Sequence, residues 1–228
     1  MLLGAALGPW YDFLRPVKGV KRDLLFVMNA DNQADKGVRH VIFHEYYRHF
    51  LPQVQDEPLP EDPQAHCALT ESLGSRELIS QYGEPTLDIA ARVNGVRYIA
   101  RENSLNITQF ELQLERDGGT LLLEMDQKLH TLPFGLCCNE FAPFSFGQRC
   151  VADYMGKNEP GMYDCAISAS WVDRTTFAIQ AQVIDTYFGC LNVHISFKDS
   201  RATLQMQGSG QYVFDGIRGY AIGTAAQT

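Results

Sequence analysis

The chain has 228 residues, of which 45% are hydrophobic and 20% are charged, so it can bury a sizeable core. Its 19 basic and 27 acidic residues give a formal net charge of −8 without a long single-sign run. No basic stripe is present to meet a phosphate backbone, which excludes nucleic acid as a partner. No apolar stretch approaches the length of a membrane span.

Residues 1–51 predict one strand and one helix. Leu24–Met28 is a continuous apolar run bounded by turn residues, which is typical of a strand buried on both faces. From about Asp35, apolar residues recur at three- and four-residue steps until Pro52, as in an amphipathic helix. A strand of this kind cannot stay bare in water, so we expect it to join a barrel, pair with a second copy or be covered.

Residues 52–84 predict a proline-rich linker followed by a short helix. Four prolines and four acidic residues lie between positions 52 and 63, which indicates a domain boundary. The segment Leu69–Tyr82 predicts the helix, which Gly83 would end.

Residues 85–228 predict an antiparallel β domain. Asn94-Gly95 is a strong hairpin signal and predicts strands over 87–93 and 96–101. The clearest hairpin surrounds Trp171, where alternating residues stop, a polar turn follows, and alternation resumes at Phe177. Further alternating runs are Phe110–Leu114, Leu121–Met125, Leu129–Leu136, Leu191–Phe197, Thr203–Met206 and a closing strand near Tyr220. Eight to ten short strands favour a sandwich or an up-and-down barrel, and a closed barrel is preferred because it leaves no edge exposed.

The segment from Cys137 to Pro160 is irregular and predicts a long loop that reaches outward. The six cysteines, at positions 67, 137, 138, 150, 165 and 190, form no C-x-x-C pair. We interpret them as reduced thiols that pack as small hydrophobes. The missing disulfide pattern and the lack of a clear signal peptide favour the cytoplasm.

No catalytic residue, metal ligand or cofactor site is predicted. The sequence has no S-x-x-K, no G-x-S-x-G and no phosphate-binding loop. His40 and His44 share a helix face, but Arg48 stands where H-E-x-x-H requires a second histidine. Cys137 or Cys138 with His130 would make a thiol–imidazole pair, although packing explains these residues better.

Aromatic residues of the strand region suggest a different use. If Tyr98, Phe134, Trp171 and Phe177 face inward, a barrel could hold a small apolar ligand among them. Phe110 and Tyr187 belong to the same set. A barrel filled by its own side chains is the interpretation we favour over a ligand cavity.

The run Leu24–Asn32, the helix to Phe50 and the later segments Leu129–Gly135 and Ser170–Asp173 resemble serine β-lactamase-like (penicillin-binding-protein-like) hydrolases. The resemblance implies the last strand and helix of a hydrolase domain (1–51), a linker with a short helix (52–84) and a lipocalin-like β-barrel (85–228). The family's S-x-x-K, Y-x-N and K-T-G or H-x-G motifs do not occur, so no catalytic residue carries over.

The resemblance implies a mainly β protein in which a lipocalin-like antiparallel barrel follows an α/β remnant. The first hypothesis is a non-catalytic accessory barrel of a serine hydrolase, which shapes access to the active site or mediates assembly. Its partners would be the parent's catalytic domain and a second copy of this chain. The alternative is a stand-alone lipocalin-like binder of a small hydrophobic ligand. A third hypothesis is a thiol or metal enzyme that uses Cys137, Cys138 or the helix histidines.

Overall fold

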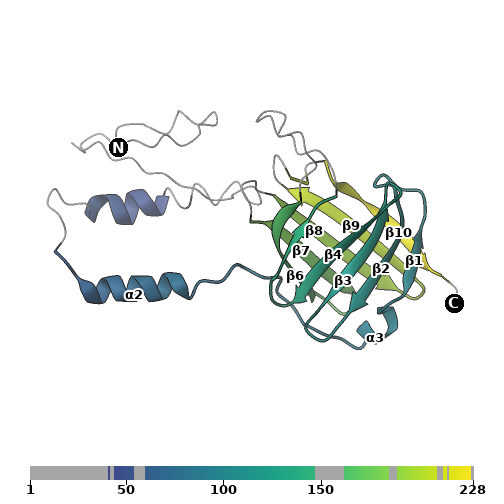
Figure 1. Ribbon diagram of the computed structural model, residues 1–228, viewed down its shortest axis with the longest axis horizontal. Coiled ribbons are helices and arrows are strands. Elements are labelled where there is room, and N and C mark those ends of the chain that lie inside the picture. Colours follow the sequence, from purple (N-terminus) through teal and green to yellow (C-terminus); the bar gives the residue numbers. More distant parts are fainter. Residues whose placement is uncertain are drawn as a thin grey trace. The chain divides into compact units, whose positions relative to one another are not determined.

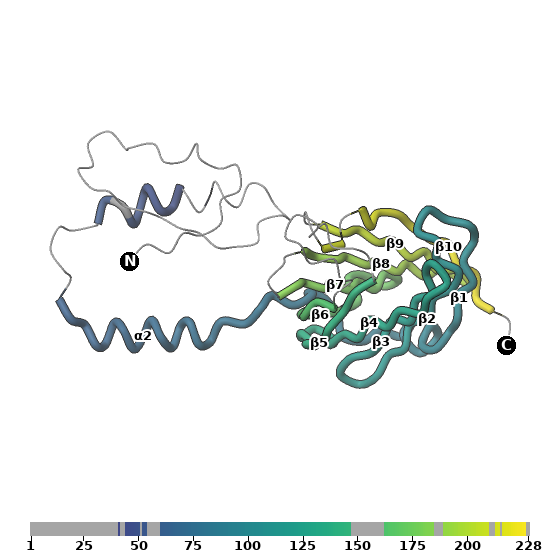
Figure 2. Tube along the Cα trace, turned by 45° about the horizontal axis from the view of Figure 1, so that its top comes forward, coloured from purple at the N-terminus to yellow at the C-terminus, as the bar shows by residue number. Residues whose placement is uncertain are grey.

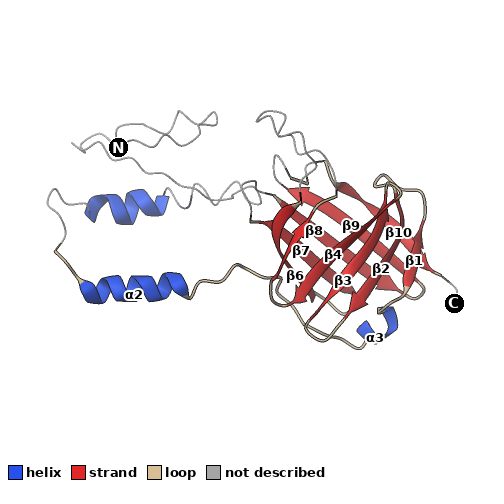
Figure 3. Ribbon diagram, viewed as in Figure 1, coloured by secondary structure: helices blue, strands red, loops and turns tan. Residues whose placement is uncertain are grey.

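The computed structural model describes residues 41, 44–53, 60–146, 162–184, 189–209, 213, 214 and 216–226. The chain forms two compact units, Met1–Ala30 and Asp31–Thr228. The first unit, and with it the predicted strand Leu24–Met28, lies outside the described residues. Strands dominate the described part and helices are few, which confirms the mainly β prediction (Figure 3).

The described residues contain ten strands. Figure 1 shows how they are arranged. They are β1 Arg97–Ala100, β2 Ile107–Leu114, β3 Gly118–Met125, β4 Lys128–Leu136, β5 Glu140–Phe144, β6 Tyr163–Trp171, β7 Thr176–Val183, β8 Cys190–Lys198, β9 Arg201–Ser209 and β10 Arg218–Ala225. Helical elements in the part of the chain that the structure describes include η2 Tyr46–Phe50, η3 Leu51–Gln53, α2 Pro63–Gly74 and α3 Ala90–Val93.

The strands close into a ring. Consecutive strands pair antiparallel, except that β5 pairs only with β6, and β1 joins β10 through Tyr98 and Ala225. The ring is completed where β4 meets β6 in parallel, with Gly135 opposite Ser168 and Leu136 opposite Ala169. The result is a closed barrel of 9 strands, with β5 added beside β6 (Figure 2). The predicted closed barrel is therefore confirmed.

Alternation sends one face of each strand into the barrel and the other outward. The predicted Trp171 hairpin is confirmed as β6 and β7, with Trp171 opposite Phe177. Its turn is held by the Asp173 carboxylate, which accepts hydrogen bonds from the backbone N–H groups of Thr175 and Thr176, both at 2.8 Å. Burial on β6 does not alternate, because the outward-facing Ser168 and Ser170 are also buried.

A segment that we call the seam strap, Leu78–Glu84, covers those two serines. The Ser170 hydroxyl donates to the Tyr82 carbonyl at 2.9 Å, and the Ser168 hydroxyl accepts from the Gln81 N–H at 2.8 Å. At its end, Glu84 exchanges two backbone hydrogen bonds with Trp171, each of 2.9 Å. The strap thus lies outside β6, next to the place where β4 and β6 close the ring.

The predicted helix Leu69–Tyr82 is wrong at both ends. Helix α2 begins at Pro63, since Asp62 caps it by accepting from the Ala65 N–H at 2.8 Å and proline suits its first position. It ends at Gly74, and the following residues form the strap instead of more helix. None of the residues of α2 is buried.

The hairpin predicted at Asn94-Gly95 is also wrong. Residues 87–93 form a turn and the short helix α3, so only one strand, β1, adjoins Asn94-Gly95. The Asn94 side chain caps the end of β2 instead, because it accepts from the Leu114 N–H at 2.7 Å and donates to the Leu114 carbonyl at 3.0 Å. A local turn signal was overridden by this longer-range contact.

The segment predicted as one long loop, Cys137–Pro160, contains β5. A left-handed residue, Cys137 with φ of 54°, turns the chain back after β4 and lets β5 run beside β6. Residues 147–160 lie outside the described part of the chain. The predicted helix before Pro52 is helical where it is described, at 41 and 44–53, and ends at Gln53.

Candidate functional site in the barrel interior

Six aromatic rings form a continuous contact series inside the barrel, which we call the aromatic chain. Its ring centroids follow one another at 5.4, 5.9, 5.9, 5.0 and 5.4 Å. In order, the members are Phe110, Tyr98, Phe197, Trp171, Phe177 and Phe134. The aromatic chain crosses the barrel near the turns that join β6 to β7 and β8 to β9.

The aromatic chain fills its part of the interior. Of its rings, Phe197 keeps 4% of its surface exposed and the others 3% or less. A side chain lining a water-sized cavity would keep surface that water could touch, so the rings contact one another and the walls directly. Two glycines make room for them: a Cβ on Gly119 would lie 2.8 Å from the Phe134 ring, and one on Gly223 would lie 2.9 Å from the Phe110 ring.

Trp171 carries a polar atom that this interior does not satisfy. Its side chain is 1% exposed, and its indole N–H has no hydrogen-bond acceptor in the described part of the chain. Leaving such a donor buried and unpaired costs about 1–3 kcal/mol. Among buried side-chain nitrogen and oxygen atoms of described residues, this one alone lacks a partner.

A second group of rings, the end cluster, lies toward the opposite end of the barrel. Phe144 contacts Phe146 edge-on at 4.8 Å, and both contact Phe214 at 6.1 Å. The His130 ring of β4 meets Phe146 at 5.2 Å. These phenyl rings are at most 7% exposed.

Two of the side chains that face the barrel interior, His130 and Tyr98, have a shifted pKa. His130 faces inward because it pairs with the buried Leu123, and burial lowers its imidazole pKa against the opposing effect of a hydrogen bond to the Ser145 backbone. Burial also raises the pKa of the Tyr98 phenol, which nearby Arg92 partly offsets. Both shifts favour the neutral form, so neither group brings a charge into the interior.

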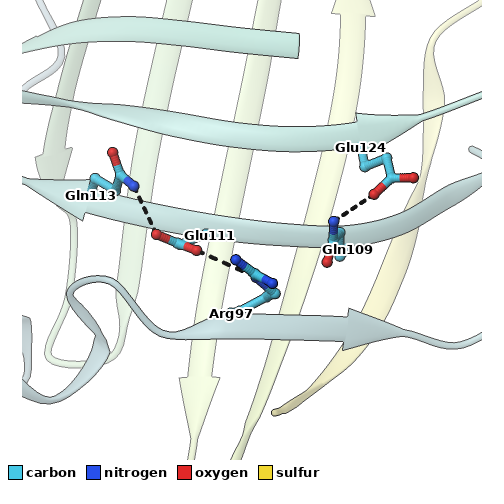
Figure 4. Close-up of polar contacts among 5 residues, drawn as sticks. All are labelled: Arg97, Gln109, Glu111, Gln113 and Glu124. Carbon is cyan, nitrogen blue, oxygen red and sulfur yellow. Dashed lines mark hydrogen bonds and ion pairs between the residues drawn. The ribbon is translucent and has the colours of Figure 1, made fainter. Parts of the chain in front are cut away.

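Charged and amide side chains of β1, β2 and β3 lie on the outer face instead (Figure 4). Arg97 pairs with Glu111 at 3.7 Å, Gln113 donates to Glu111 at 2.8 Å, and Gln109 donates to Glu124 at 2.5 Å. The charged side chains of these three strands therefore pair on the outer face, away from the barrel interior. In the described residues no three histidines, cysteines or carboxylates come together as a metal site would require.

The thiol–imidazole pair is not assembled. Cys137 follows the end of β4, whereas His130 lies near its beginning, about 23 Å away along an extended strand. The Cys137 thiol donates to the Gly83 carbonyl at 3.4 Å, and burial, with smaller effects from Cys138 and Glu84, raises its pKa. Both observations disfavour a thiolate nucleophile. His44 is described and exposed, while His40 lies outside the described residues.

The structure brings together all four residues that the sequence suggested as ligand contacts. Tyr98, Phe134, Trp171 and Phe177 belong to the aromatic chain, as does Phe110. Phe197 was missed, although its alternation with Leu191, Val193 and Ile195 carried the signal. The end cluster was missed because Phe144 and Phe146 lie in the segment expected to be a loop. Tyr187 lies outside the described residues.

No protein-family model matches the chain, and no curated protein matches it either. The resemblance to serine β-lactamase-like hydrolases, and the domain division that rests on it, therefore stay predictions. No described helix is long and apolar enough to span a membrane.

Solved β-barrels show a distant likeness. A structure described as the REP1-NXSQ fatty acid transporter has 9% identity and a TM-score of 0.41, over 61% of this chain and 99% of its own. Lipid binding protein 8 of Caenorhabditis elegans has 8% identity and a TM-score of 0.42, over 62% and 99%. The fatty acid-binding protein of Drosophila melanogaster brain has 11% identity and a TM-score of 0.39, over 58% and 99%. Likeness at this level carries no information about function.

Proposed function

We propose that the barrel binds a small hydrophobic ligand that carries one hydrogen-bond acceptor. The observation that carries the proposal is the buried indole N–H of Trp171, which lacks an acceptor in an apolar interior. A ligand carbonyl or ether oxygen beside Trp171 would satisfy this donor, and the surrounding rings would contact the ligand's hydrocarbon part.

The ligand must displace side chains, because the aromatic chain is in direct contact throughout. Burial of apolar ligand surface contributes about 25 cal/mol per Å², from which the cost of moving the rings is subtracted. We therefore expect modest affinity and slow association compared with a preformed cavity. The ligand class agrees with the descriptions of the distantly similar barrels, but the proposal does not depend on them.

The second candidate function is a non-catalytic accessory barrel that acts through its surface. The filled interior favours it, since a core packed by its own side chains has structural value without any ligand. Under this candidate the Trp171 N–H would stay unpaired or face a ring, and no apolar molecule would bind saturably.

A matched pair of ligands separates the two candidates. The ketone 2-undecanone offers one acceptor, whereas undecane has the same carbon count and none. In a Trp10→Phe background, Trp171 fluorescence reports binding, and displacement of nile red gives the dissociation constants. We expect saturable binding of both molecules, with the ketone bound more tightly.

Trp171→Phe tests the hydrogen bond directly. Removing the N–H should weaken 2-undecanone binding by about fivefold, the equivalent of one net hydrogen bond, and leave undecane binding nearly unchanged. Tyr82→Phe, which alters an exposed ring of the seam strap, is the control and should change neither constant. Absence of saturable binding for both molecules in the parent protein would leave the accessory barrel as the function.

A further inference from the structure

Strands β4 and β5 are neighbours in the chain and both contact β6, yet they form no ladder with each other in the described structure. β4 reaches β6 only at Gly135 and Leu136, and β5 pairs with the preceding part of β6. The two strands therefore diverge from the turn at Cys137, and a gap separates Lys128–Phe134 from Glu140–Phe144. The other neighbouring pairs of the ring form antiparallel ladders, with one register shift between Ile107 and Gln109 in the pairing of β2 with β3.

The hydrogen-bond phase of β4 shows which of its residues face the gap. A two-residue turn at Asp126 and Gln127, both with positive φ, makes Met125 and Lys128 a hydrogen-bonded pair. The same phase returns at Leu136, whose N–H donates to the Asp117 carbonyl at 3.0 Å. Even-numbered residues of β4 thus bond to β3, and the backbone groups of odd-numbered residues point to the gap. Pro133 is one of these.

The phase of β6 gives the same result for β5. Ile184 donates to the Asp164 carbonyl at 2.8 Å, so even-numbered residues of β6 bond toward β7. Odd-numbered residues bond toward β5, and they lie opposite Glu140, Ala142 and Phe144. The backbone groups of Phe141 and Pro143 therefore point to the gap.

Both edges of the gap consequently present a proline where a ladder would need an N–H donor. Proline lacks that donor and is found at strand edges for this reason. Pro133 and Pro143 disfavour a hydrogen-bonded ladder between β4 and β5. They also disfavour pairing with a strand of another chain. Each edge of the gap thus lacks one of the N–H donors that a ladder across it would use.

The gap has an apolar outer rim and an aromatic lining. Leu129 on β4 and Phe141 on β5 face outward on its two sides and are 66% and 63% exposed. On the inside, His130 reaches across to the Ser145 backbone and contacts the Phe146 ring. Side-chain contacts of His130 therefore connect the two sides of the gap, where no backbone ladder joins β4 to β5.

We infer that this gap is the route by which the apolar ligand of the proposed function reaches Trp171, an inference that rests on that function. The lining ring Phe134 contacts Phe177, which contacts Trp171, so the aromatic chain leads inward from the gap to the unpaired N–H. Separating β4 from β5 breaks no ladder hydrogen bond. Ring rotation at His130 and Phe146 would suffice to admit an alkyl chain.

Charged side chains at the rim test the route. In the Trp10→Phe background, the pair Leu129→Asp and Phe141→Asp should slow both association and dissociation of 2-undecanone by about tenfold in stopped-flow experiments, with an unchanged dissociation constant. A barrier outside the final binding position raises both rate constants' activation free energies equally. The matched control is Ile99→Asp with Tyr220→Asp, two exposed positions on the outer face of the laddered strands β1 and β10, and its rates should equal those of the parent.

Leu129→Met with Phe141→Leu keeps the rim apolar and should retain parental rates, and circular dichroism checks that each variant is folded. If the parent binds 2-undecanone but the aspartate pair and its control exchange it at equal rates, the route is wrong while the proposed function stands. If the parent binds neither molecule, the proposed function fails, and the route fails with it.

Discussion

The two halves of one edge of β6 are closed in different ways. Beside Trp171 the closure is dense: the Cys137 backbone N–H donates to the Ala169 carbonyl at 2.8 Å, Glu84 exchanges backbone hydrogen bonds with Trp171, and the strap covers two buried serine hydroxyls. Beside Tyr163 the closure depends on β5, whose far edge carries Pro143 and meets no ladder. The aromatic chain lies behind the dense half. Hydrogen bonds therefore close the half of the edge beside the aromatic chain. At the gap, side-chain contacts of His130 take their place.

The largest effect is expected from breaking the dense half at Gly83. A Cβ there would lie 2.4 Å from the Trp171 carbonyl oxygen and 2.5 Å from the Ser170 hydroxyl, so Gly83→Ala must push the strap away from β6. We expect the free energy of unfolding in urea to fall by about 2–4 kcal/mol. Gly74→Ala is the control, because a Cβ at that position meets nothing within 4 Å. Equal stability of the two variants would mean that the strap does not contribute to closure.

A smaller effect is expected from Ser170→Ala. This change removes the hydroxyl that donates to the Tyr82 carbonyl at 2.9 Å but keeps the backbone bridge at Glu84. The free energy of unfolding should fall by about 1–2 kcal/mol, since a part-buried hydrogen bond is lost. Ser75→Ala, which removes an exposed hydroxyl that donates to the Ser72 carbonyl, should change it by less than about 0.5 kcal/mol. A loss at Ser75 as large as that at Ser170 would contradict the comparison.

The smallest effect concerns the gap and depends on pH. The pKa of His130 is lowered from 6.5 in the folded protein, chiefly by burial, with Lys128 also lowering it and Asp126 raising it. As the pH falls, His130 is therefore protonated in the unfolded chain at a higher pH than in the folded protein. The stabilisation by neutral His130 is complete above pH 6.5 and is lost as the pH falls through the folded pKa. The difference in unfolding free energy between the parent and His130→Gln should shrink between pH 7.5 and pH 5.5.

His66→Gln is the matched control for the substitution, because His66 lies on the exposed helix α2, away from the gap. A parental profile in His130→Gln would show that this histidine does not hold the gap.

The sequence predicts the barrel because its signal is local. The sequences of β2, β3, β6, β7, β8 and β9 alternate with a period of two, because each strand has one inner and one outer face. The aromatic candidates Tyr98, Phe134, Trp171 and Phe177 were found for the same reason. Where a segment's conformation depends on distant residues, prediction failed. The seam strap is held by Ser168 and Ser170, which lie 87 and 88 residues away from their partners in the strap. Its own sequence includes residues that also favour a helix.

The gap could not be predicted from alternation at all. Pro133 and Pro143 look like ordinary loop signals until the bonding phase of β3, β4, β6 and β7 is known. The unpaired N–H of Trp171 was equally hidden, because a sequence shows a donor but not the absence of an acceptor. Both features belong to the tertiary structure, and both bear on the proposed ligand.

The pairing of β1 with β10 has a consequence for how the molecule is made. Tyr98 meets Ala225, so the ring cannot close until the last strand has left the ribosome. Contacts between residues this far apart in the sequence slow folding. Until the ring closes, the inner apolar faces of eight strands remain exposed to water. The prolines at the gap then protect the nascent chain as well, because they blunt two strand edges during the interval when stray pairing with another chain is most dangerous.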